Sequence, residues 1–412
     1  MVTLAVTGIG SLKEISFRAE PGALLALTGP PGAGKTLLLR ALAGLERPSV
    51  PDGEIRWNGR RIDQLSPRDR RAFLLGKDMA LWPHLPVGEQ VALGLRFRGR
   101  PRRAARNFPL GLFRLSSRPG EREDEENAFR EAMELAGVTK LEKQRPDRLT
   151  PEEAFRVALA RALAVRPVLL LLDDPLAGWP AGTRRQLWDL VREIARHRRL
   201  VVVWAVADPE EALAGGERVL FLHEGRLAQQ GNADEVYTNP VHLEVARFFS
   251  LHGLNLIEVQ VVTSAAEGGI RAGDGTAKRG FYLRAGPEWE LPLCCEQADR
   301  VAAWSSGEGK GREVLLMGLR PEEISVLPVD CPIPSGWGAT GPVQPARVEP
   351  HGWYSVAYFQ LPSDPAAGSP GWRVLRVNRR PEPALPSSGA QVRLSWPAAA
   401  QLFFDPVSER RV

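Results

Sequence analysis

The run Gly29-Pro30-Pro31-Gly32-Ala33-Gly34-Lys35-Thr36 decides the fold of this chain. It fits the pattern G-x-x-x-x-G-K-[ST], whose glycines allow successive backbone N–H groups to turn toward an anion. The apolar run Leu24–Thr28 before it indicates a buried strand, and Thr36–Leu45 after it indicates an apolar helix. A strand, a glycine-rich loop and a helix N-terminus in this order predict a site for the phosphates of a nucleoside triphosphate. The alternative is a glycine-rich turn that fits the pattern by chance.

All eight residues of the loop are expected to contact the nucleotide, and the last two have distinct roles. The Lys35 ammonium can reach the β- and γ-phosphates, and the Thr36 hydroxyl can ligate Mg²⁺. The second half of such a site is a carboxylate that follows another buried strand, and Val168–Leu172 followed by Asp173-Asp174 supplies it. We expect Asp173 to hold Mg²⁺, directly or through water, and Asp174 to stand where a base activates the attacking water. The expected cofactors are therefore ATP and Mg²⁺.

The pattern of the chain changes along its length. Residues 1 to about 233 alternate β-rich runs with helical patterns, which is typical of a parallel α/β sheet. Further buried strands are expected at Val168–Leu172, Leu200–Val206 and Val219–Leu222. Between about 85 and 165 the pattern is mainly helical, and within it 96–123 is rich in Arg, Pro and Gly, which favours a long loop or insertion. Residues 234–251 predict one or two linking helices, and 252–412 alternate short β segments with Gly, Pro and Ser clusters. The expected fold is therefore α/β, a P-loop NTPase core with a helical subdomain, followed by a C-terminal all-β domain.

Composition sets limits on the class of protein. The 412 residues are too many for one ordinary core and predict two or three domains. With 43% hydrophobic and 25% charged residues, the chain has the composition of a soluble globular protein. Its apolar runs are far shorter than the roughly 20 residues that span a bilayer, and we expect no secretion signal. Three cysteines and six scattered histidines have no metal-binding spacing, so no metal cluster and only reduced thiols are expected.

Arginine dominates the net charge of +5. One cluster consists of Arg96, Arg98, Arg100, Arg102, Arg103 and Arg106. Such a cluster either binds an anionic surface or forms a solvated loop. No DNA- or RNA-binding motif accompanies it, and we therefore expect no nucleic-acid partner. A DNA-binding P-loop protein is an alternative that depends on this cluster and the basic pI of about 9.3 alone.

Segments well beyond the phosphate loop resemble the ATP-binding subunits of ABC importers, of the sugar, polyamine and inorganic-ion type. The segments that carry the resemblance are Met79–Val87, Arg156–Leu163, Asp173–Leu176, Asp208–Ala212, Gly318–Glu323 and Leu402–Pro406. The resemblance extends over nearly the whole chain. It implies OB-like barrels in 252–412 for dimerisation and regulation, and a peripheral position on the cytoplasmic face of the plasma membrane. The implied partners are transmembrane permease subunits, a second ATP-binding subunit (a copy or a paralogue) and, indirectly, an extracytoplasmic solute-binding protein.

Two departures from the family concern how the nucleotide is contacted. Residues 1–16 contain no aromatic side chain that would stack on adenine, and Val6 lies near the expected place. Lys77 stands where the family has a glutamine that ligates metal. A protonated lysine cannot ligate Mg²⁺, but it can contact the γ-phosphate. The alternative is an exposed lysine without a role.

Other departures concern hydrolysis. The family's Ser-Gly-Gly-Gln signature, which caps the γ-phosphate bound to the opposite subunit, is replaced by Leu149-Thr150-Pro151-Glu152-Glu153. Proline lacks one N–H donor and the glutamates repel phosphate, whereas an N-cap, a proline and two acids together make a good helix start. We favour the interpretation that the helix survives and the phosphate clamp does not. The catalytic glutamate is replaced by Asp174, one methylene shorter, and the switch histidine by Ala207.

These departures predict ATP binding with slow or absent hydrolysis. In a self-paired dimer both composite sites carry every departure, and with an intact partner the departures are divided between two incomplete sites. Two interpretations stay open. In one, the chain is a weakened transport ATPase that couples nucleotide binding to solute import through a permease. In the other, it is a non-hydrolysing pseudo-ATPase that serves an active ABC subunit as a structural or nucleotide-sensing partner.

Overall fold

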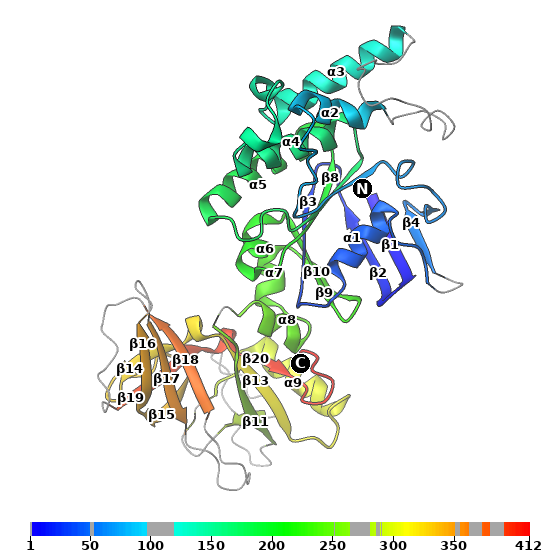
Figure 1. The fold of residues 1–412 in the computed structure, drawn as a ribbon. Helices are drawn as coiled ribbons and strands as arrows, with labels where there is room; N and C mark the ends of the chain where they lie inside the picture. Colours follow the sequence, from blue (N-terminus) through cyan, green and yellow to red (C-terminus); the bar gives the residue numbers. More distant parts are fainter. Residues whose placement is uncertain are drawn as a thin grey trace. The chain divides into compact units, whose positions relative to one another are not determined.

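The computed structural model divides the chain into two compact units, Met1–Asn239 and Pro240–Val412 (Figure 1). The structure describes residues 2–49, 53–96, 119–250, 252–263, 281–285, 289, 291–350, 355–361, 373–379 and 391–412. Among these residues, none of the helices combines the length and the apolar character that crossing a bilayer requires.

A six-stranded sheet is the centre of the first unit, in the order β10-β9-β3-β8-β7-β6. The strands are β3 (Leu24–Thr28), β6 (Ala72–Leu75), β7 (Leu169–Asp173), β8 (Val201–Ala205), β9 (Arg218–His223) and β10 (Arg226–Gly231). All neighbours pair in parallel except β10, which is antiparallel to β9. Every residue of β3 and β8 is buried, which is what apolar strands covered on both faces require. The predicted strands and the α/β class are confirmed.

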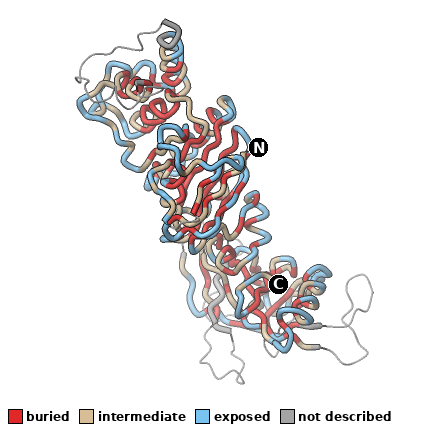
Figure 2. The backbone as a smooth tube through the Cα atoms, turned by 90° about the vertical axis from the view of Figure 1, so that its right-hand side faces the viewer, coloured by how far each residue is buried: buried red, intermediate tan, exposed pale blue. Residues whose placement is uncertain are grey.

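A second sheet and one helix complete the core around the phosphate loop. The sheet has the order β2-β1-β4-β5, formed by β1 (Val2–Ile9), β2 (Leu12–Ala19), β4 (Glu54–Trp57) and β5 (Arg60–Arg61). Helix α1 (Lys35–Ala43) contacts β1 on one side and β6, β7 and β8 on the other. Its buried leucines join one apolar cluster with residues of both sheets. Figure 2 shows the buried residues of the chain in red. This packing fixes the N-terminus of α1, where the loop ends.

Helices make up most of the remainder of this unit. They are α2 (Val87–Arg96), α3 (Pro119–Leu135), α4 (Pro151–Ala164), α5 (Ala181–Arg198), α6 (Pro209–Gly215) and α7 (Ala233–Thr238). Short 3-10 turns, Thr139–Leu141 and Pro146–Arg148, join α3 to α4. Helix α4 packs against both α2 and α3. The three helices α2, α3 and α4 therefore form a subassembly beside the sheet (Figure 1).

The expectation of a loop or insertion at 96–123 is wrong at both ends. Arg96 ends α2, and Pro119–Glu123 belong to α3. The proline at 119 and the glutamates after it suggested a loop by composition, but the first turn of a helix accepts proline and favours acidic side chains. Residues 97–118, with the other arginines of the cluster, lie outside the described residues.

Among its described residues, the second unit contains three small antiparallel sheets, in the orders β12-β11-β13-β20, β14-β19-β15 and β16-β17-β18. Their strands are β11 (Asn255–Thr263), β12 (Phe281–Arg284), β13 (Val314–Leu319), β14 (Ser325–Pro328), β15 (Trp337–Val343), β16 (Pro345–Pro350), β17 (Ser355–Leu361), β18 (Arg373–Arg379), β19 (Val392–Pro397) and β20 (Leu402–Phe404). A short helix, α8 (Leu243–Phe248), precedes them, so 234–251 contains two helices in all, α7 and α8.

Helix α9 (Cys295–Ser306) corrects the all-β expectation for 252–412. Gln297, Val301 and Trp304 are its buried residues, and their spacing of four and three places them on one helical face. Scattered Gly and Ser around this short helix hid its period from sequence inspection. The strand-rich character of the unit is otherwise as expected.

Asp405 anchors α9 to the C-terminal turn. Its carboxylate is 2% exposed and accepts hydrogen bonds from Trp304 Nε1 (2.9 Å), Arg312 (2.6 Å) and the backbone N–H groups of Val407 and Ser408 (2.9 and 2.7 Å). Burial alone would raise the pKa of Asp405, but these donors hold the pKa well below its ordinary value. The ionised carboxylate is therefore the form that stabilises this unit.

We expect Asp405→Asn to lower the free energy of unfolding of the second unit by about 3 kcal/mol at neutral pH. Because the folded pKa lies below the unfolded value, the stabilisation is present above about pH 4 and is lost as the pH falls through the folded pKa. Urea unfolding between pH 7 and pH 3 measures this, with the exposed Asp330→Asn as control. Identical acid sensitivity in the two variants would contradict the assignment.

Candidate functional site

The phosphate loop between β3 and α1 is shaped by two close approaches. Gly29 has φ +140°, and a Cβ there would lie 2.0 Å from the carbonyl oxygen of Leu222 in β9. Gly34, the N-cap of α1, has φ +102°, and a Cβ there would lie 2.8 Å from the Leu12 side chain. Glycine is therefore required at both positions for conformational and steric reasons. The rest of the loop, Pro30–Ala33, curves between these two fixed points.

Lys35 lies against the loop itself. Its Nζ donates hydrogen bonds to the carbonyl oxygens of Gly29 (2.6 Å) and Pro30 (3.1 Å). Partial burial lowers the pKa of Lys35, an effect that the carboxylates of Asp174 and Asp173 oppose. The structure thus places an ammonium group and the N-terminus of α1 at the same loop, which is the combination that binds phosphate.

Thr36 and Asp173 form the oxygen-rich part of the site. The Thr36 hydroxyl donates to Asp173 Oδ1 at 3.0 Å, which joins the start of α1 to the end of β7. A hydroxyl and a carboxylate side by side are hard oxygen ligands of the kind that Mg²⁺ takes together with water and substrate phosphates. These two residues fit the expected Mg²⁺. Over the described ranges, no group of three or more His, Cys, Asp or Glu side chains gathers into a metal cluster.

Lys77 and Asp174 form an ion pair beside this oxygen pair. Strands β6 and β7 are parallel neighbours with Leu75 opposite Leu172, so the residues two places further along meet at the same edge. Lys77 Nζ lies 3.5 Å from Asp174 Oδ2. Burial raises the pKa of Asp174, and the Lys77 ammonium opposes that effect. Asp174 also has φ +48°, an unusual conformation for a non-glycine residue. The expected base is therefore already paired.

The start of α4 uses its polar groups internally. The Thr150 hydroxyl accepts from the Glu153 N–H at 3.2 Å, and the Glu153 carboxylate accepts from the Thr150 N–H at 2.8 Å. Pro151 occupies the first helical turn, and Glu152 pairs with Arg156 at 2.9 Å. This reciprocal pair is a capping box, the helix start that the sequence predicted. The Thr150 N–H is donated within its own helix, and its hydroxyl takes part there as an acceptor, which does not use the O–H as a donor.

The last two positions at which the sequence departs from the family are Val6 and Ala207, and neither side chain has a polar group. Val6 is fully buried in β1, so its side chain is not available to stack on a base. Ala207 is exposed just after β8. Its neighbour Asp208 caps α6 by accepting from the Glu210 N–H at 2.9 Å.

Arg161 in α4 is a site residue to which the sequence reasoning gave no role. It is 6% exposed, and it donates to the carbonyl oxygens of Ala80 (2.6 Å) and Met79 (2.7 Å). Its guanidinium lies 5.0 Å from the centre of the Trp82 ring. Met79 and Ala80 both have positive φ, so the loop that begins at Lys77 is held in an unusual conformation. Arg161 is the one charged residue in the otherwise apolar run Val157–Leu163, and this was the available signal, because a buried charge needs partners.

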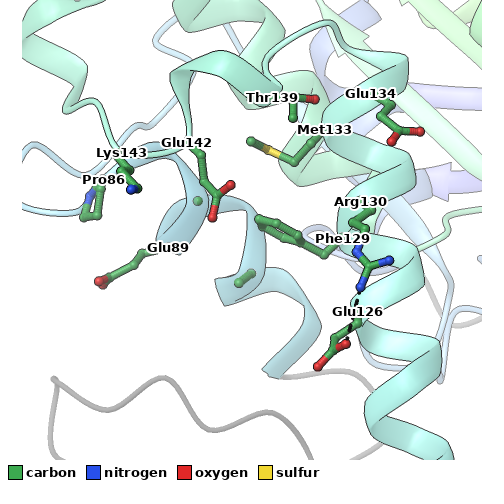
Figure 3. Close-up of a pocket in the computed structure, with 12 residues that line it drawn as sticks. Pro86, Glu89, Glu126, Phe129, Arg130, Met133, Glu134, Thr139, Glu142 and Lys143 are labelled. Carbon is green, nitrogen blue, oxygen red and sulfur yellow. Dashed lines mark ion pairs between the residues drawn. The ribbon is translucent and has the colours of Figure 1, made fainter.

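A pocket lies between α2, α3 and the turn after α3 (Figure 3). We call it the α2–α3 pocket, and its volume is about 750 Å³. Its apolar lining includes Pro86, Ala92, Phe129 and Met133, and its carboxylates are Glu89, Glu126, Glu134 and Glu142. Arg130 and Lys143 are the two basic residues, and Phe129 points into the space between the walls. The pocket is thus apolar at its centre and acidic in balance.

We expect Arg161→Met to lower the free energy of unfolding by about 3 kcal/mol, because two hydrogen bonds from a charged donor are lost and two carbonyls lose their partner. The loop from Lys77 to Trp82 should then exchange its amide hydrogens faster. Urea unfolding and hydrogen exchange measure the two effects. The exposed Arg148→Met is the control and should change stability by less than about 0.5 kcal/mol. Unchanged loop protection in Arg161→Met would contradict this role.

Comparison with known proteins places these features in a family. Residues 12–177 match the ABC transporter family. A spermidine/putrescine import ATP-binding protein of Roseobacter denitrificans is 32% identical over 316 residues, which are 77% of this chain and 74% of that protein. A molybdate/tungstate import ATP-binding protein of Thermococcus kodakarensis is 31% identical over 313 residues, 76% of this chain and 78% of that protein. Another spermidine/putrescine import ATP-binding protein, from Oleidesulfovibrio alaskensis, is 27% identical over 389 residues, 94% and 91% of the two chains.

Proposed function

Since this chain belongs to the ABC transporter family of import ATP-binding subunits, we propose that it binds ATP and couples that binding to solute import through a membrane permease. The observation that carries the proposal is the intact loop. Gly29–Thr36 is held by two required glycines, with the Lys35 ammonium against it and the Thr36–Asp173 pair at its end. Thr36 and Asp173 would hold Mg²⁺, which supplies charge neutralisation for the phosphates.

Slow hydrolysis is part of the proposal, and three features support it. Asp174 is one methylene shorter than the family's glutamate and is paired with Lys77, so its carboxylate has a competing partner. Ala207 offers no side-chain donor for a phosphate. At the start of α4, Pro151 has no N–H to donate, and the Glu153 N–H is already donated to the Thr150 oxygen. A misplaced base alone typically costs about 10²–10⁴ in rate.

A non-hydrolysing pseudo-ATPase is the second candidate function. The start of α4 favours it, because Pro151 has no N–H, the Glu153 N–H is donated within the capping box, and the carboxylates of Glu152 and Glu153 repel a phosphate on another subunit. In that role the chain would serve an active ABC subunit as a structural or nucleotide-sensing partner. The two candidates agree on nucleotide binding and differ on whether any condition produces turnover.

The α2–α3 pocket is the proposed docking surface for the permease. Four carboxylates and two basic groups line it, so it fits a short amphipathic segment with an apolar face and basic ends. The pocket wall at Pro86 and the site residue Lys77 belong to the same loop, and Arg161 holds that loop. This continuity supports coupling between the permease and the nucleotide site.

The remaining assignments follow from the family. We propose a peripheral position on the cytoplasmic face of the plasma membrane, and a second ATP-binding subunit, either a copy of this chain or a paralogue. An extracytoplasmic solute-binding protein would act through the permease. OB-like barrels in the second unit, serving dimerisation and regulation, belong to the same proposal.

We expect the purified chain to bind ATP and to turn it over at less than about 1 s⁻¹, below the usual range for enzymes. Lys35→Ala should abolish binding, because the ammonium at the loop is lost. Calorimetry and phosphate release measure the two quantities. Turnover of about 1 s⁻¹ or more that Lys35→Ala abolishes would overturn the slow-hydrolysis proposal.

The same assay separates the two candidate functions. Addition of the co-encoded permease should accelerate phosphate release if the chain is a weakened ATPase, and should leave it at background if the chain is a pseudo-ATPase. A variant that combines Lys77→Gln, Asp174→Glu and Ala207→His is the positive control. It should release phosphate faster than the natural sequence, because it restores the base and the phosphate donor.

We expect Phe129→Glu to weaken binding of the permease at least about tenfold, because it replaces an apolar contact by a further carboxylate in an acidic pocket. Nucleotide affinity should stay within about twofold, since Phe129 lies outside the phosphate site. The matched control is Leu65→Glu, which adds the same charge at an exposed leucine of the same unit. Titration of detergent-solubilised permease measures the binding. Equal affinities for the two variants would exclude the pocket as the docking surface.

A further inference from the structure

We propose that Lys77 is a built-in cation of the phosphate site, which lets this chain hold a nucleoside triphosphate with little dependence on Mg²⁺. In this role the ammonium balances Asp174 and moves to the terminal phosphate when a nucleotide binds. The inference rests on the proposed nucleotide-binding function and adds to it. Lys77 is thus the residue that determines whether this chain accepts the metal-free nucleotide in addition to the Mg²⁺-bound form.

The position of Lys77 is set by the sheet. Strands β6 and β7 are in parallel register, with Leu75 opposite Leu172, so Lys77 and Asp174 follow at the carboxyl edge where the phosphate loop follows β3. The Lys77 side chain is 66% exposed, whereas the Asp174 side chain is 21% exposed. The ammonium therefore reaches the carboxylate from the solvent side, and it is free to move to an anion that enters from there.

The backbone that carries Lys77 is fixed although its side chain is not. Arg161 donates to the carbonyl oxygens of Met79 and Ala80, two and three residues further along. Both of these residues have positive φ, an uncommon conformation for non-glycine residues. The two hydrogen bonds from Arg161 hold the loop in it. The structure thus combines a fixed origin with a long flexible stem. That is the arrangement of a lysine that follows a mobile phosphate as a point charge.

The charge balance at the loop gives this ammonium its importance. Lys35 and Lys77 are the cations nearest the two carboxylates, Asp173 and Asp174, and together the four charges cancel. Without Lys77, two carboxylates would face one ammonium, and an incoming phosphate would need a metal ion to offset the excess. Glu211, on which Asp174 acts, is paired with Arg184 at 3.3 Å and adds little to the balance.

In this arrangement the Lys77 ammonium supplies the positive charge that a metal ion would otherwise supply. It is not a ligand of the metal ion. An ammonium group has three donors and no acceptor, so it cannot ligate Mg²⁺. It can donate directly to phosphate oxygens in charge-assisted hydrogen bonds. Thr36 and Asp173 keep their oxygen ligands for Mg²⁺, so metal-bound nucleotide still binds. Loss of Lys77 should therefore lower the affinity for the metal-free nucleotide and leave the affinity for the Mg²⁺-bound nucleotide nearly unchanged.

The test is the affinity of the full chain for a non-hydrolysable ATP analogue, measured by calorimetry with Mg²⁺ and again with EDTA. For the natural sequence, removal of Mg²⁺ should weaken binding less than about tenfold. Lys77→Gln should weaken binding in EDTA by roughly tenfold or more, the loss of one charge-assisted hydrogen bond, and should change binding in Mg²⁺ far less. Asp174→Asn should act oppositely and strengthen binding in EDTA, because it removes a repulsive charge and frees Lys77.

Two controls keep the outcomes distinct. Lys140→Gln removes the same charge at an exposed lysine of the same unit and should leave both affinities unchanged. Lys77→Arg keeps the charge and should retain most of the binding in EDTA. If the natural sequence binds the analogue in Mg²⁺ but Lys77→Gln is unchanged in EDTA, the inference about Lys77 is wrong and the proposed function stands. If the natural sequence binds no analogue in either condition, the proposed function itself fails.

Discussion

The parallel pairing of β6, β7, β8 and β3 is the constraint on which the whole site depends. Parallel strands in register end at the same edge, and here Leu75 faces Leu172, which in turn faces Trp204. The Thr28 hydroxyl donates to the carbonyl oxygen of Val206 at 3.0 Å and ties the last strands of this series together. The phosphate loop, two carboxylates, a lysine and the exposed Ala207 therefore emerge side by side, although they are far apart in the sequence.

Three parts of the first unit differ in how far their polar groups are paired within the chain. The phosphate loop places the Lys35 ammonium, which donates to two carbonyl oxygens, beside the N-terminus of α1. At the start of α4, the N–H groups of Thr150 and Glu153 are both donated within the capping box. Asp174 lies between these two cases. It is paired, but the side chain of its partner Lys77 is mostly exposed and can move away from it. These differences support the proposal that the chain binds the phosphates of a nucleotide but hydrolyses the nucleotide slowly.

Arg161 connects the nucleotide site to the helices α2, α3 and α4. It belongs to α4, it fixes the loop that carries Lys77, and the same loop continues to the α2–α3 pocket. A buried guanidinium with two carbonyl partners is rigid, because moving it would leave charged and polar groups without partners. A shift of α4 would therefore be transmitted to Lys77. This gives the proposed coupling a physical path through few contacts.

By itself, the sequence determined the features whose cause is local. The glycine loop, the apolar strands around it and the capping box at Thr150 each depend on residues a few positions apart, so their patterns were legible and the structure has them. Helix α9 was missed because its buried face is short and sits among loop-forming residues. Only the tertiary structure decided that Lys77 pairs with Asp174, that Val6 is buried and that Arg161 holds a strained loop. These contacts join residues that strand register brings together, and no local pattern records that register.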